Sequence, residues 1–401
     1  MQTSWVPGAD QSGHSVHHLP YGSFTSPRNS EPRLGVRIGD RVLDLCDNAE
    51  DLAPEGPLRA ALRRPNLQGL LPLGRESWDE LRTSLQRFLT DPAKAHDLVD
   101  VSQVSLHAAF EPADYVDYYA SEHHATNLGR LFRPDSAPLM PNWKHLPVGY
   151  HGRAGTLVPS GVNIKRPSGQ RRTPDGEIVF GPSARLDIEA EMGFVVGAPT
   201  ALGDTASVDS FADHVFGLCL VNDWSARDIQ AWEYQPLGPY LGKSFATSYG
   251  AWITPLAALE AAKTEAPEQD PRPLPYLTEK DRYSYDIELA VTLNGTTVSR
   301  PNYRDMYWTP AQMLAHMTVN GASLRPGDFY ASGTISGPER SQVGAFIELT
   351  WGGKEPMKLD DGTERTFLKD GDIVSITATA RGAAGTTLEL AEVTAGVLPA
   401  D

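Results

Sequence analysis

Cysteine is scarce in this chain, which has two in 401 residues, Cys46 and Cys219. Two cysteines so far apart match no metal-binding spacing and argue against a disulfide scaffold. Long apolar runs are missing too, because no stretch reaches the roughly 18 residues that a transmembrane helix needs. The first residues, MQTSWVPGADQSGHSV, lack a basic start followed by an apolar stretch. We therefore expect no secretion signal and a cytoplasmic location.

Basic residues are outnumbered by acidic ones, 35 to 51, and the formal net charge is −16. A surface of that sign repels polyanions, so we expect neither nucleic acid nor a membrane as a partner. A small anionic substrate is not excluded, because a local basic pocket can reverse the field. The G-x-S-x-G and G-x-G-x-x-G motifs are absent as well, which argues against an α/β serine hydrolase and a dinucleotide enzyme.

The first 110 residues read as a small domain of their own. Gly39-Asp40 separates two short strand-like segments and predicts a hairpin turn. A helical region is expected over roughly residues 57 to 95. Its apolar residues fall at helical spacing, at Leu81, Leu85, Phe88 and Leu89.

Residues 111–401 read as a large, mainly β catalytic domain. Strand-like alternation recurs at residues 186–196, 285–293 and 346–351. Asn294-Gly295 predicts a tight hairpin turn. The Pro-rich stretch 261–281 is expected to be a surface loop.

The segment from Leu186 to Met192 carries closely spaced acids. Alternate residues of a strand share a face, which would put Asp187, Glu189 and Glu191 together. Like charges would then recur about every 7 Å with no basic residue between them. A hard divalent cation such as Mg²⁺ or Ca²⁺ would compensate them. The alternative is a strand face in water, where the repulsion costs little.

A buried strand over residues 215–221 leads into a predicted helix that should end before Pro236. Asp223 is placed to cap that helix. Counted from it at +4, +7 and +11, one helix face carries Arg227, Gln230 and Tyr234. Such a stripe can hold a cation and an anionic substrate. An exposed polar helix face is the alternative.

Two further segments carry groups suited to catalysis. Lys243 can present a point charge to a developing oxyanion, although a surface lysine is the alternative. Its loop does not match the phosphate-binding motif, because three residues instead of four separate Gly238 from the Gly242-Lys243 pair. Asp117, a candidate metal ligand, precedes His123 and His124, of which only one should face a site. Histidine is the usual general base, and two exposed histidines are the alternative.

The sequence resembles the fumarylacetoacetase family over nearly its whole length. Long motifs carry the resemblance: YYASEHHATN at 118–127, PNWKHLPVGYHGR at 141–153, NDWSARDIQ at 222–230, PLGPYLGKSF at 236–245 and ASGTISGPE at 331–339, with LPYG at 19–22. The resemblance implies a small N-terminal SH3-like barrel, a large C-terminal mixed β-roll and a homodimer. Glu122-His123 departs from the residues expected before the base.

The resemblance also implies a set of site residues. The metal, Ca²⁺ and/or Mg²⁺, is expected at Asp117, Glu189, Glu191 and Asp223, with Lys243 and Thr247 also around it. Because a cation is a poor ligand for a cation, we expect Lys243 either just outside the ligand shell or facing the substrate. His124 is the expected base, oriented by Glu348 on the predicted strand 346–349. Developing negative charge is expected to be stabilised by Arg227, Gln230 and Lys243. Substrate contacts are expected from Tyr119, Arg133, Tyr150, Gln230, Tyr234 and Thr334.

The implied activity is metal-dependent hydrolysis of a carbon–carbon bond in a small β-diketo acid, 4-fumarylacetoacetate. The products would be fumarate and acetoacetate, at the last step of tyrosine and phenylalanine catabolism. One alternative is a related acylpyruvate hydrolase, hydratase or decarboxylase of the same superfamily. Another is a calcium-stabilised β protein without catalysis, which would need the acids but not the histidine, lysine and arginine.

Overall fold

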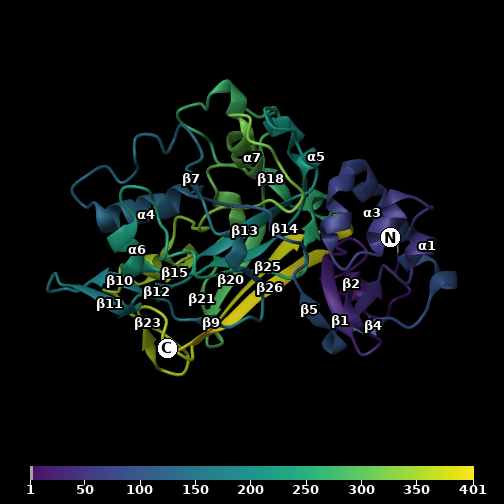
Figure 1. The fold of residues 1–401 in the computed structure, drawn as a ribbon, viewed down its shortest axis with the longest axis horizontal. Helices are drawn as coiled ribbons and strands as arrows, with labels where there is room; N and C mark the ends of the chain where they lie inside the picture. Colours follow the sequence, from purple (N-terminus) through teal and green to yellow (C-terminus); the bar gives the residue numbers. More distant parts are fainter. Residues whose placement is uncertain (1–2) are drawn as a thin grey trace.

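The N-terminal part of the chain forms a five-stranded sheet with helices beside it, at the right of Figure 1. The computed structural model describes residues 3–401. The strands follow one another in the order β4 (Val99–Asp100), β3 (Arg41–Asp44), β2 (Asn29–Ile38), β1 (Tyr21–Ser26) and β5 (Ser105–His107). Gly39, with φ 57°, turns the chain between β2 and β3. The hairpin expected there is confirmed.

The expected helical region is divided rather than continuous. It contains α2 (Pro57–Leu62) and α3 (Gly74–Thr90), and the short α1 (Ala49–Leu52) precedes them. The apolar stripe predicted for α3 is buried, with Leu81, Leu85 and Leu89 at 0% exposure. Burial of that stripe fastens the helix to the core beneath it.

An eight-stranded sheet organises the rest of the molecule. Its order is β7 (Gly149–His151), β6 (Tyr115–Tyr118), β22 (Phe329–Ala331), β13 (Ala190–Val196), β14 (Val215–Asp223), β16 (Thr247–Tyr249) and β8 (Leu157–Pro159), with β17 (Thr254–Pro255) paired to β14. Strand β14 is buried on both faces. Leu218 and Leu220 belong to one core, whereas Cys219 and Val221 belong to the other, which the N-terminal part shares. Two covered faces explain why this strand is an unbroken apolar run.

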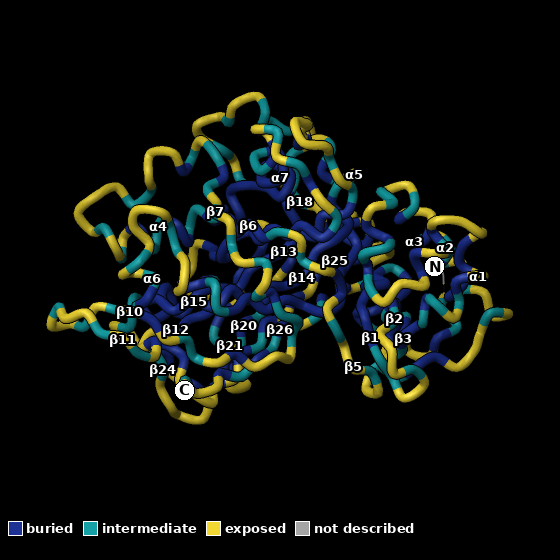
Figure 2. Tube along the Cα trace, viewed as in Figure 1, coloured by how far each residue is buried: buried dark blue, intermediate teal, exposed yellow. Residues whose placement is uncertain are grey.

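A second large sheet lies against the first, and β25 and β26 run beside β14. Its order is β21 (Thr296–Ser299), β20 (Ile287–Leu293), β25 (Ile373–Arg381), β26 (Thr387–Leu398) and β9 (Ile164–Lys165). The expected turn at Asn294-Gly295 joins β20 to β21, and both residues have positive φ, 51° and 84°. The mainly β fold class is confirmed, and the centre of the molecule is buried (Figure 2).

Shorter elements complete the chain. The two-stranded pairs are β10 (Ser168–Arg172) with β11 (Ile178–Pro182), β12 (Leu186–Asp187) with β15 (Ser225–Ala226), β18 (Lys263–Glu265) with β19 (Tyr283–Tyr285), and β23 (Met357–Lys358) with β24 (Glu364–Arg365). The helices are α4 (Glu122–Phe132), α5 (Phe211–His214), α6 (Arg227–Glu233), α7 (Pro310–Thr318) and α8 (Phe346–Leu349). Among residues 3–401, no helix has the length and apolar character to cross a bilayer.

Three sequence expectations about local structure are corrected. The predicted strand at 346–351 is the helix α8, whose four residues are all buried, so its short apolar run carried no usable period. The predicted strand at 186–196 is interrupted at residues 188–189, between β12 and β13. The stretch 261–281 is not simply a loop, because it contains β18 and a 3₁₀ turn at Pro275–Leu277.

A buried histidine joins the N-terminal segment to strand β17 of the eight-stranded sheet. His18 Nδ1 lies 2.9 Å from the Gly13 carbonyl oxygen, and its Nε2 lies 2.8 Å from the Thr254 hydroxyl on β17. Nδ1 must donate to the carbonyl, so the neutral ring accepts from the hydroxyl. Burial lowers the pKa of His18 to about 4. The ring is therefore neutral at physiological pH.

Candidate active site

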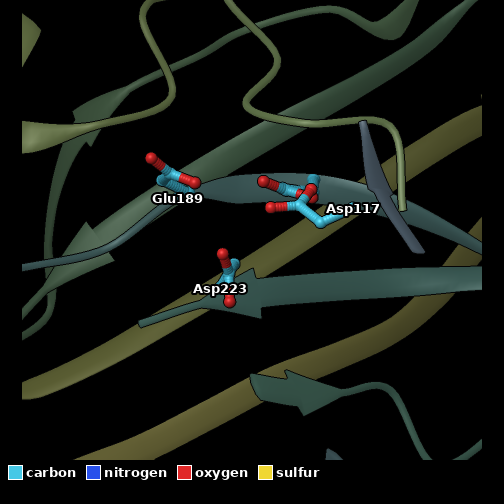
Figure 3. Close-up of side chains that lie close together, drawn as sticks. Asp117, Glu189 and Asp223 are labelled. Carbon is cyan, nitrogen blue, oxygen red and sulfur yellow. The ribbon is translucent and has the colours of Figure 1, made fainter. Parts of the chain in front are cut away.

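Four carboxylates on or next to strands β6, β13 and β14 of the central sheet meet in the protein interior. Asp117 lies on β6 and Asp223 is the last residue of β14. Glu189 immediately precedes β13, and Glu191 lies on that strand. One oxygen of each lies within 4.8 Å of the other three. The labelled carboxylates of Asp117, Glu189 and Asp223 point toward a common space in Figure 3. We call these four residues the quartet.

The quartet is buried, with exposures of 3, 5, 0 and 1% in chain order. The interpretation of Glu189 and Glu191 as a solvated strand face is therefore wrong. Backbone pairing sets the spacing, because Asp223 N donates to the Glu189 carbonyl oxygen at 3.1 Å. Buried carboxylates require compensation by cations or hydrogen-bond donors.

Two members of the quartet are compensated by basic side chains. Lys243 Nζ lies 2.5 Å from Glu189 Oε2 and 2.6 Å from Asp223 Oδ2. Arg227 Nη1 lies 2.7 Å from Glu189 Oε1. Burial opposes ionisation of Glu189, but these two cations outweigh it and hold its pKa below the usual range. Thr247 Oγ1 donates to Asp223 Oδ1 at 2.8 Å. Lys243 is 6% exposed, so the surface-lysine alternative is wrong.

The other two members keep uncompensated oxygens. Among the described residues, Asp117 Oδ1 and Glu191 Oε1 are buried without a hydrogen-bond partner. Burial and the neighbouring carboxylates raise the pKa of both groups. Glu191 Oε2 does accept from Gly333 N at 3.1 Å. Orphaned carboxylate oxygens in a cluster of four acids fit a hard divalent cation such as Ca²⁺ or Mg²⁺.

A histidine–carboxylate pair lies near the quartet. His124 Nδ1 lies 2.6 Å from Glu348 Oε2, and both residues are buried. Ser336 Oγ donates to the same oxygen at 3.0 Å, and Asn127 Nδ2 donates to Glu348 Oε1 at 2.9 Å. With Nδ1 donating to the carboxylate, Nε2 is the basic nitrogen. His124 is close enough to Glu189 to favour its ionised form.

The two adjacent histidines on helix α4 differ in burial. Ser121 caps α4 by accepting from His124 N at 3.2 Å. His124 is 1% exposed, whereas His123 is only partly buried. The alternative in which both histidines lie in water is therefore wrong. The Tyr119 ring packs edge-on against the His124 ring, with centroids 5.3 Å apart.

The predicted helical stripe from Asp223 to Tyr234 is only partly correct. Asp223 belongs to β14, and α6 begins only at Arg227 after Ala226, so Asp223 is not its cap. Arg227 is nevertheless buried at the site, and its Nη1 donates to Gln230 Oε1 at 3.3 Å. The exposed-face alternative holds only for Tyr234, which is 42% exposed. Pairing with a strand overrode the capping preference of Asp223.

The remaining predicted substrate residues differ in their burial and in their contacts. Tyr150 stands opposite Asp117 in the β6–β7 pair, which puts both side chains on one sheet face. Thr334 is 1% exposed and its hydroxyl has no partner among residues 3–401. Arg133 follows α4 and donates from Nη2 to the Pro138 carbonyl oxygen at 2.8 Å. Tyr234 has a contact away from the quartet, since its hydroxyl accepts from Gln235 Nε2 at 3.0 Å.

Sequence reasoning missed the residues that surround Glu348. Asn127 lies three residues after His124 on α4, and that spacing shares a helix face, so the signal was present. Ser336 had no such signal, because it reaches Glu348 through the fold of the chain. The acid Asp187 was noticed, but it is not part of the quartet.

The fold and the site together define a class of protein. It is an enzyme that combines a carboxylate site suited to a divalent cation with a carboxylate-bound histidine suited to proton transfer. A family model for the fumarylacetoacetate hydrolase C-terminal domain matches residues 115–389, and one for the fumarylacetoacetase N-terminal domain matches residues 17–115. The chain belongs to this hydrolase family.

Named relatives cover almost the whole chain. Fumarylacetoacetase of Homo sapiens is 44% identical over 399 residues, which covers 94% of this chain and 95% of that protein. Fumarylacetoacetase of Arabidopsis thaliana is 45% identical and covers 94% of each chain. A solved fumarylacetoacetate hydrolase from Exiguobacterium antarcticum has a TM-score of 0.57 at 15% identity, over 95% of this chain and 99% of that one. That likeness shows a shared fold.

Proposed function

We propose that this chain hydrolyses 4-fumarylacetoacetate to fumarate and acetoacetate with the help of a divalent cation. The observation that carries the proposal is the buried quartet beside the His124–Glu348 pair, in a chain with full-length similarity to named fumarylacetoacetases. A calcium-stabilised β protein without catalysis would need the acids. It would have no use for a buried histidine held by a carboxylate.

The quartet residues Asp117, Glu189, Glu191 and Asp223 would hold the cation. Their orphaned oxygens on Asp117 and Glu191 support this assignment. A bound divalent cation would supply Lewis-acid polarisation of the diketone oxygens. Lys243 already contacts two of the carboxylates, so it compensates their charge from outside the ligand shell.

The side chains of the protein can carry the remaining chemistry. Glu348 holds Nδ1 of His124 as a donor, so Nε2 can remove a proton from water. The resulting hydroxide adds to the carbonyl carbon, and Arg227, Gln230 and Lys243 are the proposed partners of the oxyanion. The carbon–carbon bond then breaks to release an enolate, which takes up the proton that His124 removed from water and becomes acetoacetate. Tyr119, Arg133, Tyr150, Tyr234 and Thr334 are the proposed substrate contacts.

The test is the ultraviolet absorbance of fumarylacetoacetate incubated with the purified protein, before and after chelation. We expect loss of the diketone band only with metal present, and equal amounts of fumarate and acetoacetate. Cleavage of an acylpyruvate instead would move the substrate assignment to the related hydrolases. If metal changes only the melting temperature and no substrate is cleaved, the enzymatic proposal is rejected.

Four further expectations belong to the same proposal. They are the SH3-like closure of the N-terminal sheet, the homodimer, the cytoplasmic location and the choice between Ca²⁺ and Mg²⁺. Support for reducing surroundings comes from Cys46 and Cys219, which are both unpaired thiols. A site made of carboxylate oxygens suits both ions, because coordination number and flexibility distinguish them.

A further inference from the structure

Asp187 is a completely buried carboxylate whose hydrogen-bonding capacity is filled by N–H donors. Its Oδ1 accepts from Ile188 N and Phe346 N, both at 2.8 Å. Its Oδ2 accepts from Ile347 N at 3.0 Å and from Arg227 Nε at 2.8 Å. A carboxylate offers about four acceptor positions. Four donors occupy them, which leaves Asp187 no acceptor position for a metal.

These four hydrogen bonds connect the helix that carries Glu348 to the arginine that contacts the quartet. Phe346 and Ile347 begin α8, the one-turn helix that carries Glu348. Arg227 begins α6 and reaches the quartet through Glu189. A helix of one turn is too short to hold its own position. Asp187 therefore fixes the position of the start of α8 relative to Arg227.

We propose that Asp187 is a positioning residue that sets the His124–Glu348 pair and Arg227 in mutual register. The inference rests on the proposed function, because it assigns these groups to one reaction. Asp187 itself touches neither substrate nor metal. It acts by holding Glu348 where it orients His124 and by aiming Arg227 at the developing oxyanion.

Asp187→Asn is the informative substitution, because an amide has almost the shape of a carboxylate. In the asparagine, an amide NH₂ group replaces one of the two carboxylate oxygens. At either position this donor faces a backbone N–H donor of α8, so that hydrogen bond is lost. We expect kcat per folded molecule to fall about 10- to 100-fold, the usual effect of losing an outer positioning partner. KM should change little, because binding residues keep their places.

Asp228→Asn is the matched control. Asp228 also ties α6 to the neighbouring segment, since its oxygens accept from Ser183 Oγ at 2.6 Å and Ala184 N at 2.8 Å. It makes no bond to α8, so kcat should stay at the unsubstituted value. Asp187→Ser is a second variant for the case in which the amide prevents folding, because it removes the tie without introducing an opposed N–H. It should lower kcat in the same way.

A double-variant cycle tests whether Asp187 acts through Glu348. If it does, the combined loss in Asp187→Asn/Glu348→Gln is smaller than the product of the single losses. A merely structural role would lower the folded fraction and leave kcat per folded molecule unchanged in both Asp187 variants. That result, or a fully multiplicative cycle, overturns the inference. An unsubstituted enzyme that cleaves no fumarylacetoacetate overturns the proposed function, and the inference with it.

Discussion

Replacement of Glu348 by glutamine is expected to place the ring proton of His124 on the wrong nitrogen. Glu348 Oε2 faces His124 Nδ1 and the Ser336 hydroxyl, and Oε1 faces Asn127 Nδ2. In the variant, the amide oxygen can keep the bond from Asn127 while the amide nitrogen donates to Nδ1. Every group is then satisfied, since a hydroxyl can donate or accept. The proton moves to Nε2, which can no longer accept one from water.

The size of the loss follows from the role of the base. A positioned general base contributes about 100- to 10,000-fold to the rate, or roughly 3 to 5 kcal/mol in activation free energy. We expect Glu348→Gln to lose activity within this range. Metal binding should survive, because Glu348 lies outside the quartet.

Asn127→Asp should reverse part of that loss, although it is harmful by itself. A carboxylate only accepts, so in the Glu348→Gln background it draws the amide nitrogen toward position 127. The amide oxygen then faces His124 and restores the Nδ1–H form. We expect at least about a tenfold recovery, or about 1.4 kcal/mol. In the unsubstituted protein, Asn127→Asp sets two acids together in a partly buried place and should lower activity.

The assay is the initial rate of diketone loss with saturating metal and substrate, per folded molecule. The ¹⁵N shifts of the imidazole ring report its tautomer directly. The reasoning is refuted if Asn127→Asp lowers activity equally in both backgrounds. A Glu348→Gln enzyme with close to normal turnover would refute it as well.

Three other predictions concern separate parts of the molecule. His124→Ala should fold and bind calcium but lose about 100-fold or more in turnover, and near-normal turnover would exclude it as the base. Lys243→Met should lower the stability of the metal-free protein by about 3 to 5 kcal/mol in denaturant titrations, because buried Asp223 loses the cation paired with it and Glu189 keeps only Arg227. An unchanged midpoint would contradict this. The depressed pKa of His18 means that the unfolded chain binds more protons between pH 6.5 and about 4. His18 should therefore lower the stability by about 3 kcal/mol as pH drops through this window, and His18→Gln should reduce the slope, while buried His14, with a pKa lowered to about 2, keeps its own contribution.

Much of the fold was readable from local patterns, because local chemistry decides those elements. Asn294-Gly295 accepts positive φ and so marks its hairpin. The spacing of Leu81 and Leu85 marks a helix with one buried face. Helix α8 was misjudged because all four of its residues are buried, so its pattern had no polar side to give a period.

The candidate site was predictable in chemistry but not in arrangement. Asp117 and Asp223 are 106 residues apart, and only the order of β6, β22, β13 and β14 in the sheet brings them together. The partners of Lys243, Glu189 and Asp223, are also far apart in sequence, by 34 residues. Residue patterns marked these side chains as separate candidates, and the family resemblance grouped them into one site.

The three acids at 187, 189 and 191 show why acid spacing alone cannot identify a metal site. They share one strand-like segment and are all buried, yet their surroundings differ. Asp187 is filled by four N–H donors, Glu189 is held by two cations, and only Glu191 keeps an orphaned oxygen. A carboxylate can bind a metal only with the lone pairs that its neighbours leave. The number of donors around each acid, set by strands and helices far along the chain, therefore separates the positioning residue from the ligands.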